Sequence, residues 1–176
     1  KQYLIALNIF NYYNVLEINI SDFKKEFYAL DNNESMRYML SGIYHFVKDD
    51  CAEKAIKIPY DTQDATYEES QFSDNSINDI KNRIQALRHV LYGDYFTEST
   101  SIFLMDYFKK MDENTFTTID TEIVNLESVG GTLSGYFDNS ITNTTERQKI
   151  LSIYNSLITI SNAIQTFATK EGITQL

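Results

Sequence analysis

The longest uncharged segment of the chain is a stretch of twenty residues, 150–169, that has the periodicity of a helix. Lys149 precedes it and Lys170 follows it. Its large apolar residues recur at alternating steps of three and four, which places them in one stripe along a helix. They are Ile150, Ile153, Leu157, Ile160, Ile164 and Phe167. Because a solvated helix of an acidic chain is expected to carry charges, the segment predicts a helix that other surfaces cover on most sides.

Three kinds of covering surface are compatible with residues 150–169: the rest of the same domain, a second chain, or lipid. A membrane span is disfavoured, since Ser, Thr, Asn and Gln fill about half of the segment and hydrocarbon penalises them. A coiled coil is disfavoured too, because the stripe covers fewer than three heptads. We therefore favour the central helix of a bundle. A seam with a second copy or a partner chain is the first alternative, and a membrane-inserting helix is the second.

The remainder of the chain also has helical periodicity and few residues that break helices. It contains a single proline and six glycines. Helices are predicted over residues 3–30, 35–57, 76–92, 99–111 and 117–129, with Pro59 ending the second and Gly130-Gly131 closing the last. Ser76 with Asp79, and Asn143 with Glu146, have the spacing of helix-capping pairs.

These patterns predict an all-α fold, a single-domain bundle of five to seven helices around a buried C-terminal helix. The domain is expected to span residues 1–176, with a polar acidic loop at about 60–75 and a glycine-containing break at about 130–142. A chain of this length buries enough surface to fold without disulfides or metals. The single cysteine, Cys51, excludes an internal disulfide and is compatible with any compartment.

The charge of the chain is acidic and unevenly spread. The formal net charge is −10, and no basic residue occurs between Asp61 and Asp79. Nucleic acids and anionic membranes are both bound mainly through Lys and Arg, so this charge disfavours them as partners. It favours a basic protein partner.

The densest group of basic residues follows directly on the next helix, where Arg83 and His89 lie six residues apart. An imidazole beside a guanidinium can assist cleavage of a phosphodiester, with the base taking a proton and the cation stabilising the phosphorane. In this spacing the helix resembles the HEPN family of all-helical ribonucleases. The resemblance implies Arg83 and His89 as the catalytic pair of a metal-independent ribonuclease, acting across a dimer. The alternative interpretation is a solvated basic face that offsets the acidic loop before it.

Other kinds of site have weaker support in the sequence. Two histidines and one cysteine on distant segments give no zinc spacing, and no Glu-x-x-His pair or glycine-rich phosphate loop occurs. His45 is interpreted as a surface or partly buried histidine. No cofactor and no metal are predicted.

The sequence thus favours a non-enzymatic role: an acidic helical module that binds a protein partner, self-associates, or acts as a regulator or sensor. The first alternative is the HEPN-like ribonuclease, the one hypothesis under which RNA is a partner. The second is an extracytoplasmic ligand-sensing bundle, a class whose helices often favour Ser, Thr, Asn and Gln. No integral membrane span is predicted.

Overall fold

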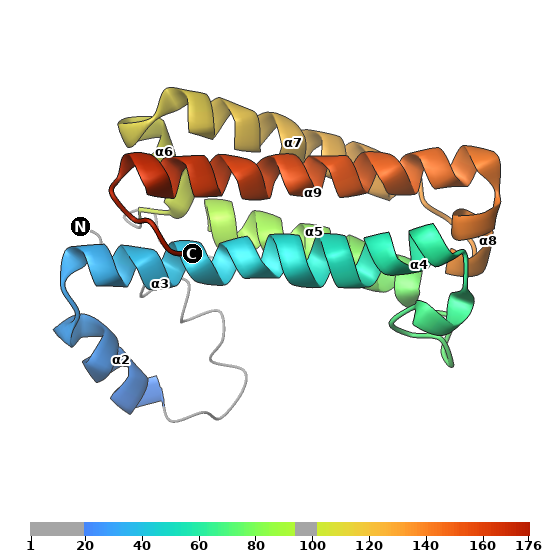
Figure 1. The fold of residues 1–176 in the computed structure, drawn as a ribbon, viewed down its shortest axis with the longest axis horizontal. Coiled ribbons are helices and arrows are strands. Elements are labelled where there is room, and N and C mark those ends of the chain that lie inside the picture. The colour runs from blue at the N-terminus through green and yellow to red at the C-terminus, as the bar shows by residue number, and fades with distance from the viewer. Residues whose placement is uncertain (1–19, 94–101) are drawn as a thin grey trace.

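The computed structural model of the chain describes residues 20–93 and 102–176, with side chains from Lys25 onward. Four long helical segments lie alongside one another in a bundle (Figure 1). One is a continuous rod of three elements, α3 (Asn32–His45), the π-helix η2 (Phe46–Lys57) and α4 (Ile58–Thr62). The other three are α5 (Ser76–Tyr92), α7 (Glu113–Gly131) and α9 (Thr144–Lys170).

Shorter elements connect the four segments or extend from them. They are α2 (Ile20–Ala29), the 3-10 turn η3 (Ala65–Tyr67), α6 (Leu104–Met111) and α8 (Phe137–Thr142). With the rod counted as one helix and η3 set aside, the described residues form seven helices and no strand. The predicted all-α bundle is therefore confirmed. The parts of the expected helices that fall in residues 3–19 and 99–101 lie outside the described residues.

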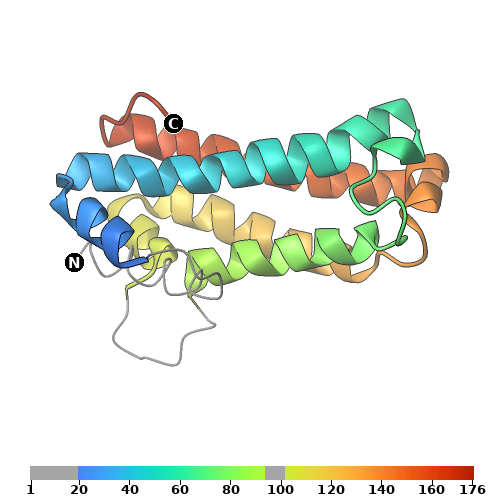
Figure 2. The same ribbon diagram turned by 90° about the horizontal axis from the view of Figure 1, so that it is seen from below.

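The C-terminal helix α9 packs against most of the bundle. It contacts α7, the three elements of the rod, and α8, while α5 contacts α7 and η2. Figure 2 accordingly shows the rod and α5 on the near side, with α7 and α9 behind them. The whole predicted apolar stripe of α9 is buried, from Ile150 to Phe167. Phe167 meets Phe108 of α6 edge to face, with ring centroids 4.8 Å apart. The remaining face of α9 reaches solvent at positions such as Asn155 and Asn162.

The rod differs from the sequence prediction at both ends. It begins at Asn32, where the side chain of Asp31 accepts a hydrogen bond of 2.9 Å from the backbone N–H of Glu34. The expectation that Pro59 ends this helix is wrong, because the rod continues to Thr62. Pro59 lies in the first turn of α4, where a missing N–H is tolerated best. The wider π-helical turns of η2 precede it, and they give the rod a different hydrogen-bonding register at that point.

Two of the predicted helix ends are confirmed by their geometry. Asn143 caps α9, and its side-chain oxygen accepts from the N–H groups of Thr145 and Glu146 at 3.0 and 3.3 Å. Gly93 closes α5 in the left-handed conformation, with φ of 64°. A Cβ at Gly93 would also overlap the ring of Phe103. Across residues 20–93 and 102–176, none of the helices combines the length and apolar character needed to cross a bilayer.

Candidate functional site

The end of the bundle where α4 leads into α5 gathers most of the acidic residues noted in the sequence. We call residues 63–75, which connect α4 to α5, the tip loop. It contains η3 and a series of turns, and it lies at the same end of the bundle as α8 (Figure 1). Gln63 and Asp74 adopt left-handed backbone conformations, with φ of 53° and 51°. These two residues turn the chain sharply out of the rod and back into α5.

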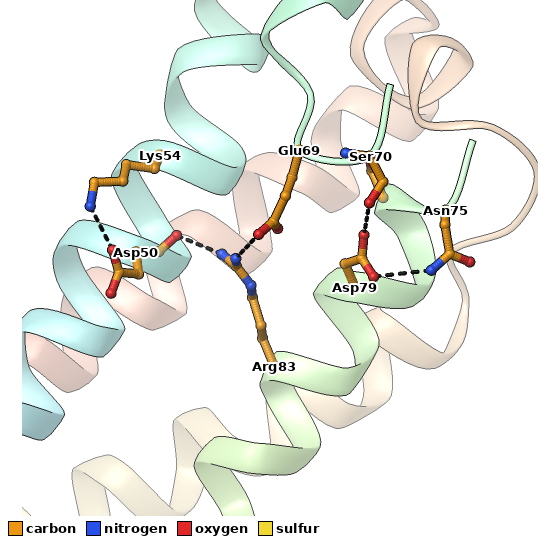
Figure 3. A network of polar contacts seen from close by, with 8 residues as sticks. Asp50, Lys54, Glu69, Ser70, Asn75, Asp79 and Arg83 are labelled. Carbon is orange, nitrogen blue, oxygen red and sulfur yellow. Dashed lines mark hydrogen bonds and ion pairs between the residues drawn. The ribbon is translucent and has the colours of Figure 1, made fainter. Parts of the chain in front are cut away.

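Arg83 holds the tip loop against the rod. Its Nη1 donates to the backbone carbonyl of Asp50 in η2 at 2.7 Å, and its Nη2 forms an ion pair with Glu69 of the tip loop. Figure 3 shows the guanidinium between these two acceptors, with Lys54 paired to the Asp50 carboxylate alongside. The Arg83 side chain is about three-quarters buried. Its donors are thus used to join three segments: α5, η2 and the tip loop.

A second set of contacts fixes the C-terminal half of the tip loop. The hydroxyl of Ser70 donates to Asp79 Oδ2 at 2.5 Å, and Asn75 Nδ2 donates to Asp79 Oδ1 at 3.0 Å (Figure 3). The backbone N–H of Ser70 donates to Ser76 Oγ at 3.1 Å. The prediction that Ser76 and Asp79 cap each other's backbone N–H groups is therefore wrong. Helix α5 begins at Ser76 without a side-chain cap, and both side chains bind the tip loop instead.

Glu68 is the one buried carboxyl group of the tip loop. It is 7% exposed, and its Oε2 is buried without a hydrogen-bond partner. Burial raises the pKa of this carboxyl above its usual value, and the nearby carboxylates of Asp138 and Asp74 raise it further, whereas a hydrogen bond with Ser76 lowers it. Glu68 is thus a carboxyl group buried at a cost, in a loop that the contacts of Arg83, Ser76 and Asp79 hold in place.

Arg147 braces the same end of the bundle from α9. Its Nη1 donates to the carbonyl oxygens of Tyr60 and Ile141, at 2.9 and 2.5 Å. Its guanidinium also lies over the Tyr60 ring, 3.9 Å from the centroid. Since Tyr60 belongs to α4 and Ile141 to α8, this one side chain joins three helices. Helices α4, α8 and α9 are therefore joined at the end of the bundle that carries the tip loop, and we call these joined helices and the tip loop the framework.

Exposed aromatic and aliphatic side chains lie on this framework. Phe72 is fully exposed at the turn of the tip loop, and Tyr67 is 54% exposed. Ile58 of α4 and Tyr136, next to α8, are 42% and 57% exposed. We call these four side chains the tip surface. Their exposure was not predicted from the sequence. The one feature of the sequence that could have indicated this surface is Phe72, an isolated Phe within an acidic, polar loop.

Arg83 and His89 occupy different surroundings. Arg83 faces η2 and the tip loop, whereas His89 lies in the last turn of α5, about 9 Å further along the helix axis. The carbonyl of His89 accepts from the N–H of Gly93 at 2.8 Å in the helix cap. The contacts of Arg83 are those of a structural cation: a backbone carbonyl and a carboxylate.

The remaining candidates from the sequence are placed as follows. His45 is exposed, and its Nδ1 lies 2.6 Å from Asp49 Oδ2 one turn later. Cys51 is buried, and burial raises the pKa of its thiol to about 12. With Arg83 it lines an apolar cavity of about 10 Å³, roughly the size of one water molecule. In the described part of the chain, no group of three or more His, Cys, Asp and Glu side chains could hold a metal ion.

Comparison with known proteins assigns the chain to a family. Residues 10–164 match the sequence model of the peptidase M75 family, imelysin, and no curated protein matches the chain. The match covers most of the chain, whereas the resemblance to HEPN ribonucleases rested on one helix. The HEPN assignment is therefore wrong, and Arg83, which it implied as catalytic, binds η2 and the tip loop. The chain belongs to the imelysin family.

Proposed function

We propose that this chain is an extracytoplasmic, non-catalytic helical module that binds a basic protein partner through the tip surface. The observation that carries the proposal is the fully exposed ring of Phe72 on a loop that is fixed at several points. A flexible loop could bury such a ring against its own domain. The tip loop is held by Arg83 and Asp79 with Phe72 facing solvent.

The physical character of the tip surface fits a docking site. Aromatic side chains supply much of the binding energy in protein interfaces, and a preformed loop avoids the entropic cost of ordering on binding. The charge of the surroundings then selects the partner. The tip loop carries no basic residue, and the carboxylates of Asp64 and Asp74 are exposed on it, beside the Glu69 carboxylate that pairs with Arg83. A partner with Lys or Arg around an apolar pocket complements this arrangement.

The extracytoplasmic setting is supported by membership of the imelysin family. It is also supported by the composition of the solvent-facing helix surfaces, of which α9 is the best example. Its exposed positions between the two flanking lysines are all Asn, Gln or Thr, polar residues that are common in extracytoplasmic helical bundles. Fractionation of the native host, with immunodetection in the extracytoplasmic and cytoplasmic fractions, tests this part of the proposal.

Partner binding can be tested with a displayed library of random peptides selected against the purified chain. We expect the enriched peptides to be rich in Lys and Arg and to contain an apolar residue. Their binding should weaken as salt is raised, because exposed charges are screened. Phe72→Ala should raise the dissociation constant about tenfold or more, in the range of an interface hot spot.

The matched control is Val124→Ala, which removes an exposed apolar side chain of α7 that is not part of the tip surface. It should leave the dissociation constant unchanged. The proposal is overturned if no basic peptides are enriched, or if they bind Phe72→Ala as tightly as the unmodified chain. Hydrolysis of the bound peptides, in line with the name of the family, would overturn the non-catalytic part.

A further inference from the structure

Glu68 is the most deeply buried charged residue in the described part of the chain. It follows directly on η3, and its Oε2 has no hydrogen-bond partner. Glu146 of α9 also has a buried oxygen without a partner, but its other oxygen binds Lys149 Nζ at 2.7 Å. The tip loop's ion pair with Arg83 is made by Glu69. The charge of an ionised Glu68 is therefore not neutralised where the side chain lies.

The surroundings of Glu68 come from α5, α8 and the tip loop itself. The hydroxyl of Ser76, the first residue of α5, hydrogen-bonds to it. The same hydroxyl oxygen accepts from the backbone N–H of Ser70 at 3.1 Å, so Ser76 has a single proton to donate. The charged groups that act on Glu68 are the carboxylates of Asp74, in the tip loop, and Asp138, in α8. Both repel a carboxylate, so a neutral carboxyl group is buried there at lower cost.

Three consecutive residues of the tip loop each bind a different residue of α5. The pairs are Glu68 with Ser76, Glu69 with Arg83, and Ser70 with Asp79. Figure 3 shows the second and third pairs next to each other above α5. Because the three positions are consecutive, Glu68 cannot move into water without displacing the two contacts that follow it. Phe72 lies two residues after Ser70, so its position depends on the same contacts.

We propose that protonation of Glu68 controls whether the tip loop stays on α5. We call the loop seated while residues 68–70 bind α5, as in the structure, and open once they have left it. The protonated carboxyl group keeps the loop seated. Loss of its proton to solvent leaves a buried charge without a cation and shifts the equilibrium toward the open loop.

The direction of the pH effect follows from the burial of Glu68. Its pKa is raised in the seated loop, so the seated loop holds the proton more tightly than the open loop does. The open population is therefore smallest below the pKa of an exposed Glu, about 4.3. It increases as the pH rises through the pKa of Glu68 in the seated loop, and is constant above it.

Hydrogen exchange of the Ser70 N–H, followed by NMR, measures the open population, because this N–H binds Ser76 Oγ only in the seated loop. Glu68→Gln is uncharged at every pH and serves as the reference. Dividing the exchange rate of the unmodified chain by that of Glu68→Gln at the same pH removes the intrinsic pH dependence of exchange. We expect this ratio to be close to unity at about pH 4 and to rise to about fivefold or more at about pH 8.

Glu69→Gln is the control for a general effect of charge. It also removes one carboxylate from the tip loop, but this carboxylate pairs with Arg83. At about pH 8, Glu69→Gln should speed up exchange at Ser70, whereas Glu68→Gln should slow it. A ratio that does not rise with pH would overturn the proposal. So would a change of rate in the same direction in both variants.

The consequence for peptide binding rests on the docking function proposed above, in which the seated loop presents Phe72 on a fixed support. At about pH 8, Glu68→Gln should then bind a selected basic peptide at least as tightly as the unmodified chain, although it has lost a carboxylate. The predicted exchange ratio without any peptide binding would support control by Glu68 and contradict the docking function. Peptide binding through Phe72 with a constant exchange ratio would do the reverse, so the two proposals can fail independently.

Discussion

Arg83 of α5 forms an ion pair with Glu69, fourteen residues earlier in the chain, and also donates to the carbonyl of Asp50 in η2. One side chain thus joins the tip loop to two helices. Arg83→Ala should leave the Asp50 carbonyl without this donor and free the tip loop. We expect a loss of about 1–2 kcal/mol in the free energy of unfolding and faster proteolytic cleavage within residues 63–75. Chemical denaturation and limited proteolysis measure the two effects.

Lys54→Ala is the matched control for Arg83→Ala. It removes an exposed ion pair with the Asp50 carboxylate, 2.6 Å long, and leaves the tip loop contacts in place. Stability and proteolysis should change little, because exposed pairs contribute little. Equal sensitivity of the two variants to protease would contradict the role given to Arg83.

Glu68 should make stability depend on pH with a definite sign. Its pKa is raised in the folded protein, mainly by burial, so the folded state holds the proton more tightly than the unfolded state. The contribution of Glu68 to stability is therefore fully present below its unfolded pKa of about 4.3. It is lost as the pH rises through the folded pKa. Glu68→Gln should become increasingly more stable than the unmodified chain over this window, as measured by thermal unfolding at a series of pH values.

Asp64 provides a comparison of opposite sign. Its pKa is lowered, chiefly by the hydrogen bond from the backbone N–H of Thr66 at 2.9 Å. The stabilising effect of this carboxylate is present above its unfolded pKa and lost as the pH falls through the folded pKa. Asp64→Asn should thus be less stable than the unmodified chain at neutral pH, with the difference shrinking in acid. If Glu68→Gln and Asp64→Asn changed stability in the same direction as the pH rises, the burial of the Glu68 carboxyl would be contradicted.

Substitutions on opposite faces of α9 should differ strongly. Ile160 is completely buried, and Ile160→Ala should lower the free energy of unfolding by about 2–5 kcal/mol, the range for large cavities in a core. Asn162 is exposed two residues later, and Asn162→Ala should change it by less than about 0.5 kcal/mol. Denaturant unfolding distinguishes these values. Similar costs at both positions would argue against the orientation of α9.

Cys51 should be chemically inert in the folded protein. Burial raises the pKa of its thiol to about 12, and the thiolate is the reactive form. A thiol reagent such as Ellman's reagent should therefore modify it only after unfolding. Gln85→Cys introduces a thiol at an exposed position of α5 and should react at once under native conditions. Rapid modification of Cys51 in the native chain would show that the contact between η2 and α5 opens readily.

Much of the fold could be predicted from periodicity. Every residue in the predicted stripe from Ile150 to Phe167 is buried. Apolar residues at alternating spacings of three and four form one apolar face of a helix, and burying that face removes it from water. The Asn143 cap was predictable for a similar reason, since its contacts are local in the sequence. Local patterns were also the source of the errors. Pro59 was expected to end a helix, but the π-helical register before it gives the proline a place in a first turn.

The tip surface could not be predicted, because it depends on contacts between distant segments. Nothing in the sequence around Arg83 indicates that its partner is Glu69 and not solvent. The same is true of Arg147 and the carbonyl of Tyr60, 87 residues apart. Phe72 was visible in the sequence as an isolated aromatic residue. Its exposure follows only once these long-range contacts have fixed the tip loop.

The central claim, a non-catalytic docking role for the tip surface, is tested most directly by calorimetric titration of a selected basic peptide, followed by mass spectrometry of the recovered peptide. The account predicts that the unmodified chain binds the peptide, that Phe72→Ala binds it about tenfold more weakly or worse, and that the peptide is recovered intact. Equal binding by both proteins, or a cleaved peptide, would contradict it.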